Sequence, residues 1–246
     1  MPPSRTRALP RFSDQAVRRA SAAALGALCL IVVTGAAVRL TQSGLGCPDW
    51  PTCNGSRLVA PWRYHAVVEF GNRMVTIAVV VAVGSALVTA LLAERRRRDL
   101  VWLAAGSVVG VFAQAVLGGI TVLVHLSPGW VMAHFLLSMA VIADGVVLYH
   151  RAGEPVGTAV ALVGEPVRRL SAVMVGLTAV VLGLGTVVTG AGPHSGSTGV
   201  ARLPISARDA AEVHSTLVML LIGVVLAATL LLRPARAPRA VVDRAQ

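Results

Sequence analysis

The sequence has few charged residues and no lysine. Only 13 % of its 246 residues are charged, whereas 55 % are hydrophobic and the mean hydropathy is +0.74. This composition is too apolar for a soluble globular domain and is typical of a protein that crosses a membrane several times. No stretch between the apolar segments is long enough to form a separate soluble domain.

Six apolar segments are long enough to cross a bilayer as helices, each of which takes about 20 mostly apolar residues. They cover residues 20–41, 64–93, 100–123, 129–150, 170–190 and 210–232. A transmembrane β-barrel would instead need short segments of alternating polarity, and runs such as residues 77–92 lack that alternation. The sequence therefore predicts an all-α, polytopic transmembrane bundle with six spans.

The net charge of +11 comes from arginines that lie mostly on one side of this bundle. Sixteen of the 22 basic residues fall in the N-terminal segment, the second and fourth connections and the C-terminal segment. Because positive residues are retained in the cytoplasm, both termini are predicted to be cytoplasmic. The arginines at residues 95–98 then determine topology, and no nucleic-acid partner is expected. The first apolar run is too long for a cleavable signal peptide.

The spans divide the chain into five predicted parts. These are a disordered basic cytoplasmic tail (1–19), a four-helix N-terminal half (20–150) with an outer cysteine loop (42–63), a cytoplasmic linker (151–169), a two-helix partial second half (170–232) and a disordered cytoplasmic tail (233–246). The sequence Val-Val-Thr-Gly-Ala occurs at residues 32–36 and again at 187–191. Internal repeats are common in membrane bundles and place sites at related positions in the two halves.

Five of the six histidines are predicted to lie at the outer face, and three of them lie just inside an apolar segment. His65, His134 and His214 each fall within about two turns of the start of a span, and these three spans enter the membrane from the same side. Neutral imidazoles at one depth of a helical bundle suit an axially ligated haem or another metal. A single such histidine is more simply a structural residue, so the matched depth of all three indicates the site.

The second span carries further polar groups close to its histidine. Glu69 lies four residues after His65, and Asn72 and Arg73 lie three and four residues after Glu69. At these helical spacings, three of the four residues share one helix face. Ionisable residues in spans usually face a bundle interior or a cavity. Glu69 is a candidate for carrying a proton or positioning a substrate, and it is also placed to pair with Arg73 one turn away. These two interpretations are compatible.

Two of the three cysteines lie in the outer loop. Cys47 and Cys53 are in the compartment where disulfides persist, and prolines between them bend the chain. A structural staple and a redox-active pair both fit this arrangement. Cys29 lies in the middle of a span and is interpreted as a small apolar residue.

Several of these elements together resemble the haem A synthase family. The most specific is Gly-Leu-Gly-Cys-Pro-Asp-Trp-Pro at residues 44–51, and the others are Glu-Phe-Gly-Asn-Arg at 69–73, Gln-Ala-Val-Leu-Gly-Gly at 114–119, Ala-His at 133–134 and Thr-Gly-Ala-Gly-Pro-His-Ser-Gly at 189–196. The resemblance extends from about residue 25 to 232. It implies a multi-pass protein of the bacterial plasma membrane that oxidises the C8 methyl of haem O to a formyl group, which gives haem A for cytochrome oxidase.

The resemblance also implies an architecture and a set of site residues. Family members have eight helices in two four-helix halves, with a haem-ligand histidine on each even-numbered helix. One half binds the haem O substrate and the other binds haem b. Glu69 matches the family glutamate of the second helix, Cys47 and Cys53 match the disulfide pair of the loop, and His134 and His214 match the ligands of the fourth and sixth helices.

The chain departs from the family pattern in two ways. Asn72 stands where the second helix has its ligand, and because an amide is a poor ligand of haem iron, His65 is the expected substitute. Actinobacterial-type members are similar in carrying this asparagine, and a composition with arginine as the only long basic residue suits such a high-GC source. The seventh and eighth helices are missing, so the second half is expected to be truncated and its haem site to lack one axial ligand.

These features favour a membrane oxidoreductase acting on haem O, in which the protein supplies an apolar slot, an axial imidazole and a carboxylate. The predicted site consists of the iron ligands His65, His134 and His214, the neighbouring cofactor-binding residues Asn72 and Arg73, and the catalytic Glu69. Expected partners are lipid, haem O, a haem O synthase, cytochrome oxidase assembly proteins and further copies of the chain. The alternatives are a haem-binding assembly factor or degenerate paralogue without synthase activity, and a transporter or structural bundle without haem.

Overall fold

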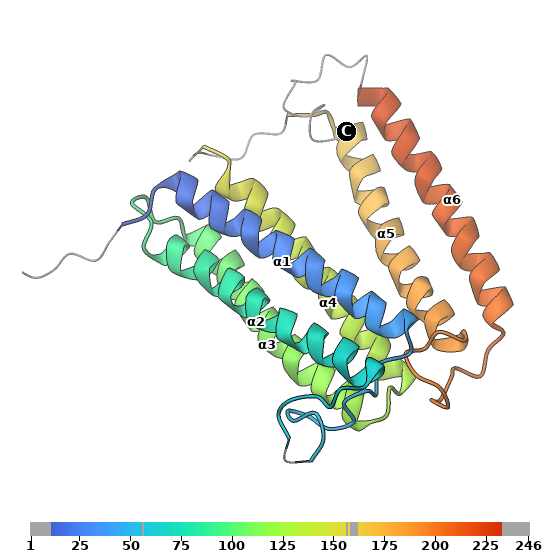
Figure 1. Cartoon of the computed structure of the whole chain (residues 1–246). Coiled ribbons are helices and arrows are strands. Elements are labelled where there is room, and N and C mark those ends of the chain that lie inside the picture. The colour runs from blue at the N-terminus through green and yellow to red at the C-terminus, as the bar shows by residue number, and fades with distance from the viewer. Residues whose placement is uncertain (1–10, 56, 156, 158–161, 233–246) are drawn as a thin grey trace, which may run out of the picture. The chain divides into compact units, whose positions relative to one another are not determined.

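The computed structural model describes residues 11–55, 57–155, 157 and 162–232. Six helices account for most of these residues: α1 (Asp14–Leu40), α2 (Tyr64–Leu91), α3 (Arg98–Leu123), α4 (Pro128–Ala152), α5 (Glu165–Ala191) and α6 (Ala207–Leu232) (Figure 1). All six are long and apolar enough to cross a membrane. The predicted all-α class and the six spans are confirmed.

Helix α1 begins six residues before the predicted span. The side chain of Ser13 accepts a hydrogen bond from the backbone N–H of Ala16 at 3.3 Å, and Asp14 places a negative charge in the first turn. Both features stabilise a helix N-terminus. Residues 14–19 are therefore helical, which corrects their assignment to a disordered tail. The remainder of that tail up to residue 10, and the tail at 233–246, lie outside the described residues.

The helices form two compact units. The first contains α1 to α4 together with the segment His194–Ala201, and the second contains α5 and α6. The segment His194–Ala201 joins the first unit although it connects the two helices of the second. Its Gly196 carbonyl accepts a hydrogen bond from the Gly44 N–H at 2.9 Å. This segment lies within the predicted second half (170–232), and the local sequence gives no sign of the long-range pairing with Gly44.

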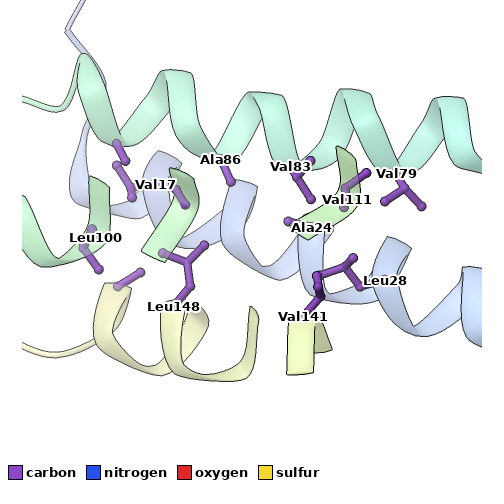
Figure 2. Packing of buried hydrophobic residues seen from close by; sticks show 13 residues of the cluster. Val17, Ala24, Leu28, Val79, Val83, Ala86, Leu100, Val111, Val141 and Leu148 are labelled. Atoms are coloured by element: carbon purple, nitrogen blue, oxygen red, sulfur yellow. The ribbon is translucent and has the colours of Figure 1, made fainter. Parts of the chain in front are cut away.

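In the first unit, α1 and α3 each pack against both α2 and α4, while α5 and α6 pack against each other in the second unit. Figure 2 shows the apolar core of the first unit from close by. The core occupies one half of the unit, because its members come from the N-terminal parts of α1 and α3 and from the C-terminal parts of α2 and α4. They are Val17, Ala24, Leu28, Val79, Val83, Ala86, Ala90, Leu100, Ala104, Val111, Val141, Leu148 and Ala152. The other half, next to the cysteine loop at residues 41–63, is here called the loop half.

Candidate functional site

Glu69 and Arg73 fasten the cysteine loop to α2. Glu69 is 5 % exposed, and its Oε2 accepts a hydrogen bond from the Cys47 N–H at 2.7 Å. Its Oε1 lies 2.6 Å from Arg73 Nη2. Arg73 also donates to the carbonyl of Cys47 at 2.9 Å and to the carbonyls of Asp49 and Thr52 at 3.0 Å each. One guanidinium thus satisfies three loop carbonyls and a buried carboxylate.

The predicted pairing of Glu69 with Arg73 is confirmed by these contacts. Both carboxylate oxygens are engaged, one by a cation and one by a backbone N–H. A buried charge persists when it is paired and hydrogen-bonded in this way. The arrangement leaves a chemical role for Glu69 open, because a carboxylate held by an arginine can still accept or pass on a proton.

Cys47 and Cys53 form a disulfide with an S–S distance of 1.99 Å. Both residues are almost completely buried, at 0 % and 1 % exposed. Thiol–disulfide exchange needs access of an attacking thiolate to a sulfur atom. The enclosed position therefore favours the structural staple over the redox-active pair.

Glycines allow the loop to approach the helices closely. A Cβ atom at Gly46 would overlap the backbone carbonyl of His65, so only glycine fits there. On α3, a Cβ atom at Gly119 would lie 2.6 Å from Cδ2 of Trp50. The indole of Trp50 therefore rests directly on the backbone of α3, and the loop contacts both α2 and α3.

His134 lies in the loop half of the first unit, against α3. A Cβ atom at Gly118 would lie 3.1 Å from His134 Cε1, so the ring fits against the bare glycine. The Nδ1 atom of His134 is buried without a hydrogen-bond partner. One turn before Gly118, Gln114 donates from its Nε2 to the His134 carbonyl at 3.0 Å and to Ser138 Oγ at 2.6 Å.

The second unit repeats the contact between histidine and glycine. A Cβ atom at Gly185 on α5 would lie 3.1 Å from Cε1 of His214 on α6. The Nδ1 atom of His214 is also buried without a partner. His134 and His214 therefore share a glycine contact and an unpaired Nδ1 in the two units, which supports the internal duplication predicted from the sequence.

His65 occupies a different position from these two rings. It is the second residue of α2 and is exposed, and its Nδ1 lies 2.9 Å from Ser43 Oγ, which in turn lies 2.8 Å from Thr41 Oγ1. The residues around it line a cavity of about 160 Å³: Gln42, Leu45, Gly46, His65, Ser197 and Thr198. Pockets that enclose larger organic ligands measure roughly 300–1,000 Å³, so this cavity by itself does not enclose a macrocycle.

Asn72 faces α1. Its Oδ1 accepts a hydrogen bond from Thr34 Oγ1 at 2.7 Å, and Thr34 belongs to the first copy of the repeated Val-Val-Thr-Gly-Ala sequence. At 1.5 Å per residue, Asn72 lies about 10 Å further along α2 than His65. His65 and Asn72, the position at which the resemblance implies a ligand, are therefore at different depths.

The three predicted iron ligands do not form one metal-binding cluster. His65 and His134 belong to the first unit and His214 belongs to the second. Within the part of the chain that the structure describes, no group of three or more histidine, cysteine, aspartate or glutamate side chains could hold a metal ion. A haem needs only one or two axial side chains, so the single rings of His134 and His214 are the relevant candidates.

Gln114 and Asp144 are polar residues within spans that are not among the predicted site residues. Gln114 lies in one of the motifs quoted above, but its contacts are with another helix. Asp144 interrupts the apolar sequence of α4 and accepts a hydrogen bond from Ser107 Oγ at 2.6 Å. An acidic residue within a span is a sign of function or of interhelical pairing, and this sign was present in the sequence.

Comparison with known proteins identifies a matching family and several relatives. Residues 18–193 match the COX15-CtaA family, described as cytochrome oxidase assembly protein. Relatives named heme A synthase include those of Geobacillus thermodenitrificans (34 % identical over 105 residues), Lysinibacillus sphaericus (32 % over 111) and Bacillus mycoides (30 % over 107). No solved structure is significantly similar to the chain.

The family match covers more of the chain than the alignments with the individual relatives do. The alignments with the three relatives cover 43 %, 44 % and 44 % of this chain and 33 %, 36 % and 34 % of the relatives' own length. The family match is longer and extends from α1 to the end of α5, which includes the cysteine loop, Glu69, Gln114 and His134 but not His214. The chain therefore belongs to the COX15-CtaA family of cytochrome oxidase assembly proteins.

Proposed function

We propose that this protein is a haem A synthase that oxidises the C8 methyl of haem O to a formyl group. One observation carries the proposal most directly: the loop half of the first unit holds a cluster of polar groups, whereas the other half is mainly apolar and has Asp144 and Ser107 as its own polar pair. The groups of the loop half are Glu69, Asn72, Gln114, His134 and Ser138. Polar groups are costly within a membrane unless they serve a site.

His134 is the residue proposed to hold the substrate haem. Its ring lies against Gly118 and its Nδ1 is buried, so Nε2 is the proposed ligand atom. A neutral imidazole nitrogen is a common axial ligand of haem iron. His65 remains a candidate for the opposite axial position only if the substrate reaches the level of the cysteine loop, because His65 begins α2.

Glu69 is the proposed group for proton handling. Converting a methyl to a formyl group takes two successive two-electron oxidations. With water as the oxygen source these are R–CH3 + H2O → R–CH2OH + 2 H⁺ + 2 e⁻ and R–CH2OH → R–CHO + 2 H⁺ + 2 e⁻, and the electrons pass to an external electron acceptor. Glu69 is the buried carboxylate beside the loop, and Arg73 balances its charge. Proton uptake by Glu69 would require one of its two present hydrogen bonds to loosen.

A resident haem b fits His214 in the second unit. The ring rests against Gly185, and its buried Nδ1 has no partner, as for His134. His214 would supply an axial nitrogen, and the bound haem b would supply a one-electron carrier. In this proposal the residues of the second unit bind and orient that group, and the residues of the first unit act on the substrate.

Co-expression with a haem O synthase tests the proposed activity. Pigments extracted from the membranes should contain a formyl-bearing haem, and His134→Ala should abolish it. His150→Ala is the matched control, because His150 lies on the same helix at the opposite end of the unit. His65→Ala should retain most of the formyl product, since His65 contacts Ser43 in a separate cavity.

The same experiment separates the alternative functions. Asn72, an amide at the family's ligand position, favours a haem-binding assembly protein without synthase activity. Such a protein would show a Soret band that depends on His134 but would yield no formyl-bearing haem. Purified protein without a Soret band would exclude both haem-dependent functions.

A further inference from the structure

We infer that Gln114 is a positioning residue for His134: its amide oxygen and the imidazole Nδ1 both lack a hydrogen-bond partner in the structure, and we assign them to each other, directly or through one bridging water, so that Nε2 is directed toward the iron of the substrate. The inference deepens the proposed function and rests on it for the role of Nε2. Two observations carry it. Gln114 Oε1 and His134 Nδ1 are both buried without a partner, and Gln114 Nε2 already donates a hydrogen bond to the His134 carbonyl.

The orientation of the Gln114 amide follows from its contacts. Its Nε2 donates to the His134 carbonyl at 3.0 Å and to Ser138 Oγ at 2.6 Å. Ser138 Oγ itself donates to the same carbonyl at 2.9 Å. If the amide were turned over, its oxygen would face the His134 carbonyl and two acceptors would meet. The amide nitrogen is therefore fixed, and so is Oε1, which is buried and has no partner.

The ring of His134 provides the complementary group. Its Nδ1 is buried without a partner, and Gly118 confines the ring on the α3 side. A buried polar atom left unpaired costs about 1–3 kcal/mol. Pairing Nδ1–H with Gln114 Oε1, directly or through one bridging water, removes this cost for both atoms. The proton then resides on Nδ1, and the lone pair of Nε2 is free to bind iron.

In the second unit, the position that corresponds to Gln114 carries no amide. Gln114 lies four residues before Gly118 on α3, and the residue four before Gly185 on α5 is Val181. Valine offers no acceptor to the Nδ1 of His214. His134 and His214 thus both contact a glycine, but the residue one turn before that glycine is Gln114 in one case and Val181 in the other. The inferred hydrogen bond to Nδ1 is therefore assigned to the proposed substrate site and not to His214.

One experiment needs no haem. In full-length protein labelled with ¹⁵N-histidine, nitrogen chemical shifts report which ring nitrogen of His134 carries the proton. We expect the Nδ1–H tautomer in the wild type and a shift toward Nε2–H in Gln114→Leu. Ser107→Ala, on the same helix and interface, should leave the tautomer unchanged. A wild-type protein in the Nε2–H form would overturn the inference whether or not the protein is a synthase.

The second experiment measures the midpoint potential of haem O bound through His134, in a His214→Ala background. A stronger acceptor for Nδ1–H makes the imidazole a better donor to iron and lowers the potential. Gln114→Glu should therefore lower the potential and Gln114→Leu should raise it, with affinity for haem about 10- to 100-fold weaker in Gln114→Leu. Shifts in the same direction, or shifts no larger than in Ser107→Ala, would contradict a positioning role.

The two proposals fail separately in these measurements. If His134→Ala leaves haem binding unchanged, the proposed substrate site is wrong, and the tautomer measurement still decides the role of Gln114. If Gln114→Leu does not accumulate in the membrane, Gln114→Glu alone remains decisive, because it keeps the size of the side chain. A potential in Gln114→Glu equal to that of the wild type would then overturn the inference.

Discussion

Arg73 illustrates how much of the loop depends on a single side chain. Its guanidinium reaches Glu69 and the carbonyls of Cys47, Asp49 and Thr52 at once. Several donors in a rigid planar fork make this set of contacts possible, and a lysine ammonium cannot reproduce it.

Arg73→Lys should therefore loosen the loop while keeping the charge. We expect the buried Cys47–Cys53 disulfide to become reducible at lower concentrations of a thiol reductant, measured by alkylation of the released cysteines. Arg208→Lys is the control, because Arg208 pairs with Glu212 at the surface and is 86 % exposed. If Arg73→Lys is reduced at the same thiol concentration as the wild type, the loop does not depend on the Arg73 guanidinium, and the disulfide and the other loop contacts are sufficient to hold it.

Local spacing predicted the contacts within one helix or loop but not those between helices. The Glu69–Arg73 pair followed from a separation of four residues, and the disulfide pair followed from the loop resemblance. The bond between Asn72 and Thr34 and those of Gln114 join different helices. Such contacts depend on the rotation and depth of each helix, which a single sequence does not specify.

At the scale of elements, α3 approaches the loop through Gly119. The close contact with Trp50 leaves no room for a Cβ atom. Gly119→Ala should displace the indole and lower the thermal stability of the protein in detergent, by a few degrees for a typical penalty of 1–3 kcal/mol. Gly71→Ala on α2 is the control, because a Cβ atom there meets nothing within 4 Å. Equal melting temperatures in the two variants would contradict the packing of Trp50 on α3.

The helix bounds were predictable because the spans are long apolar runs between polar connections. The start of α2 at residue 64 and the end of α3 at residue 123 agree with the prediction. The start of α1 does not agree, since its first turns contain charged residues such as Arg18 and Arg19 and are defined by the Ser13 cap instead. Hydropathy detects the membrane-embedded part of a helix, whereas capping sets its actual end.

For the whole molecule, the distribution of arginine predicts which ends of the helices face the cytoplasm. A reporter enzyme that is active only outside the cytoplasm should be active when inserted after residue 55 and inactive when inserted after residue 153. The first site lies in the cysteine loop and the second follows α4. Activity at residue 153 and none at 55 would invert the topology and place the proposed site at the cytoplasmic face.

The pairing of Gly44 with Gly196 has a practical consequence for dissecting the protein. An eight-residue stretch from the later part of the polypeptide completes the fold of the earlier part. A fragment ending at residue 155 would leave the Gly44 N–H without its acceptor, whereas nicking the intact chain after that residue would preserve the bond. Insertions or fusion points between residues 191 and 207 therefore need to spare that stretch, although it looks like an ordinary surface connection.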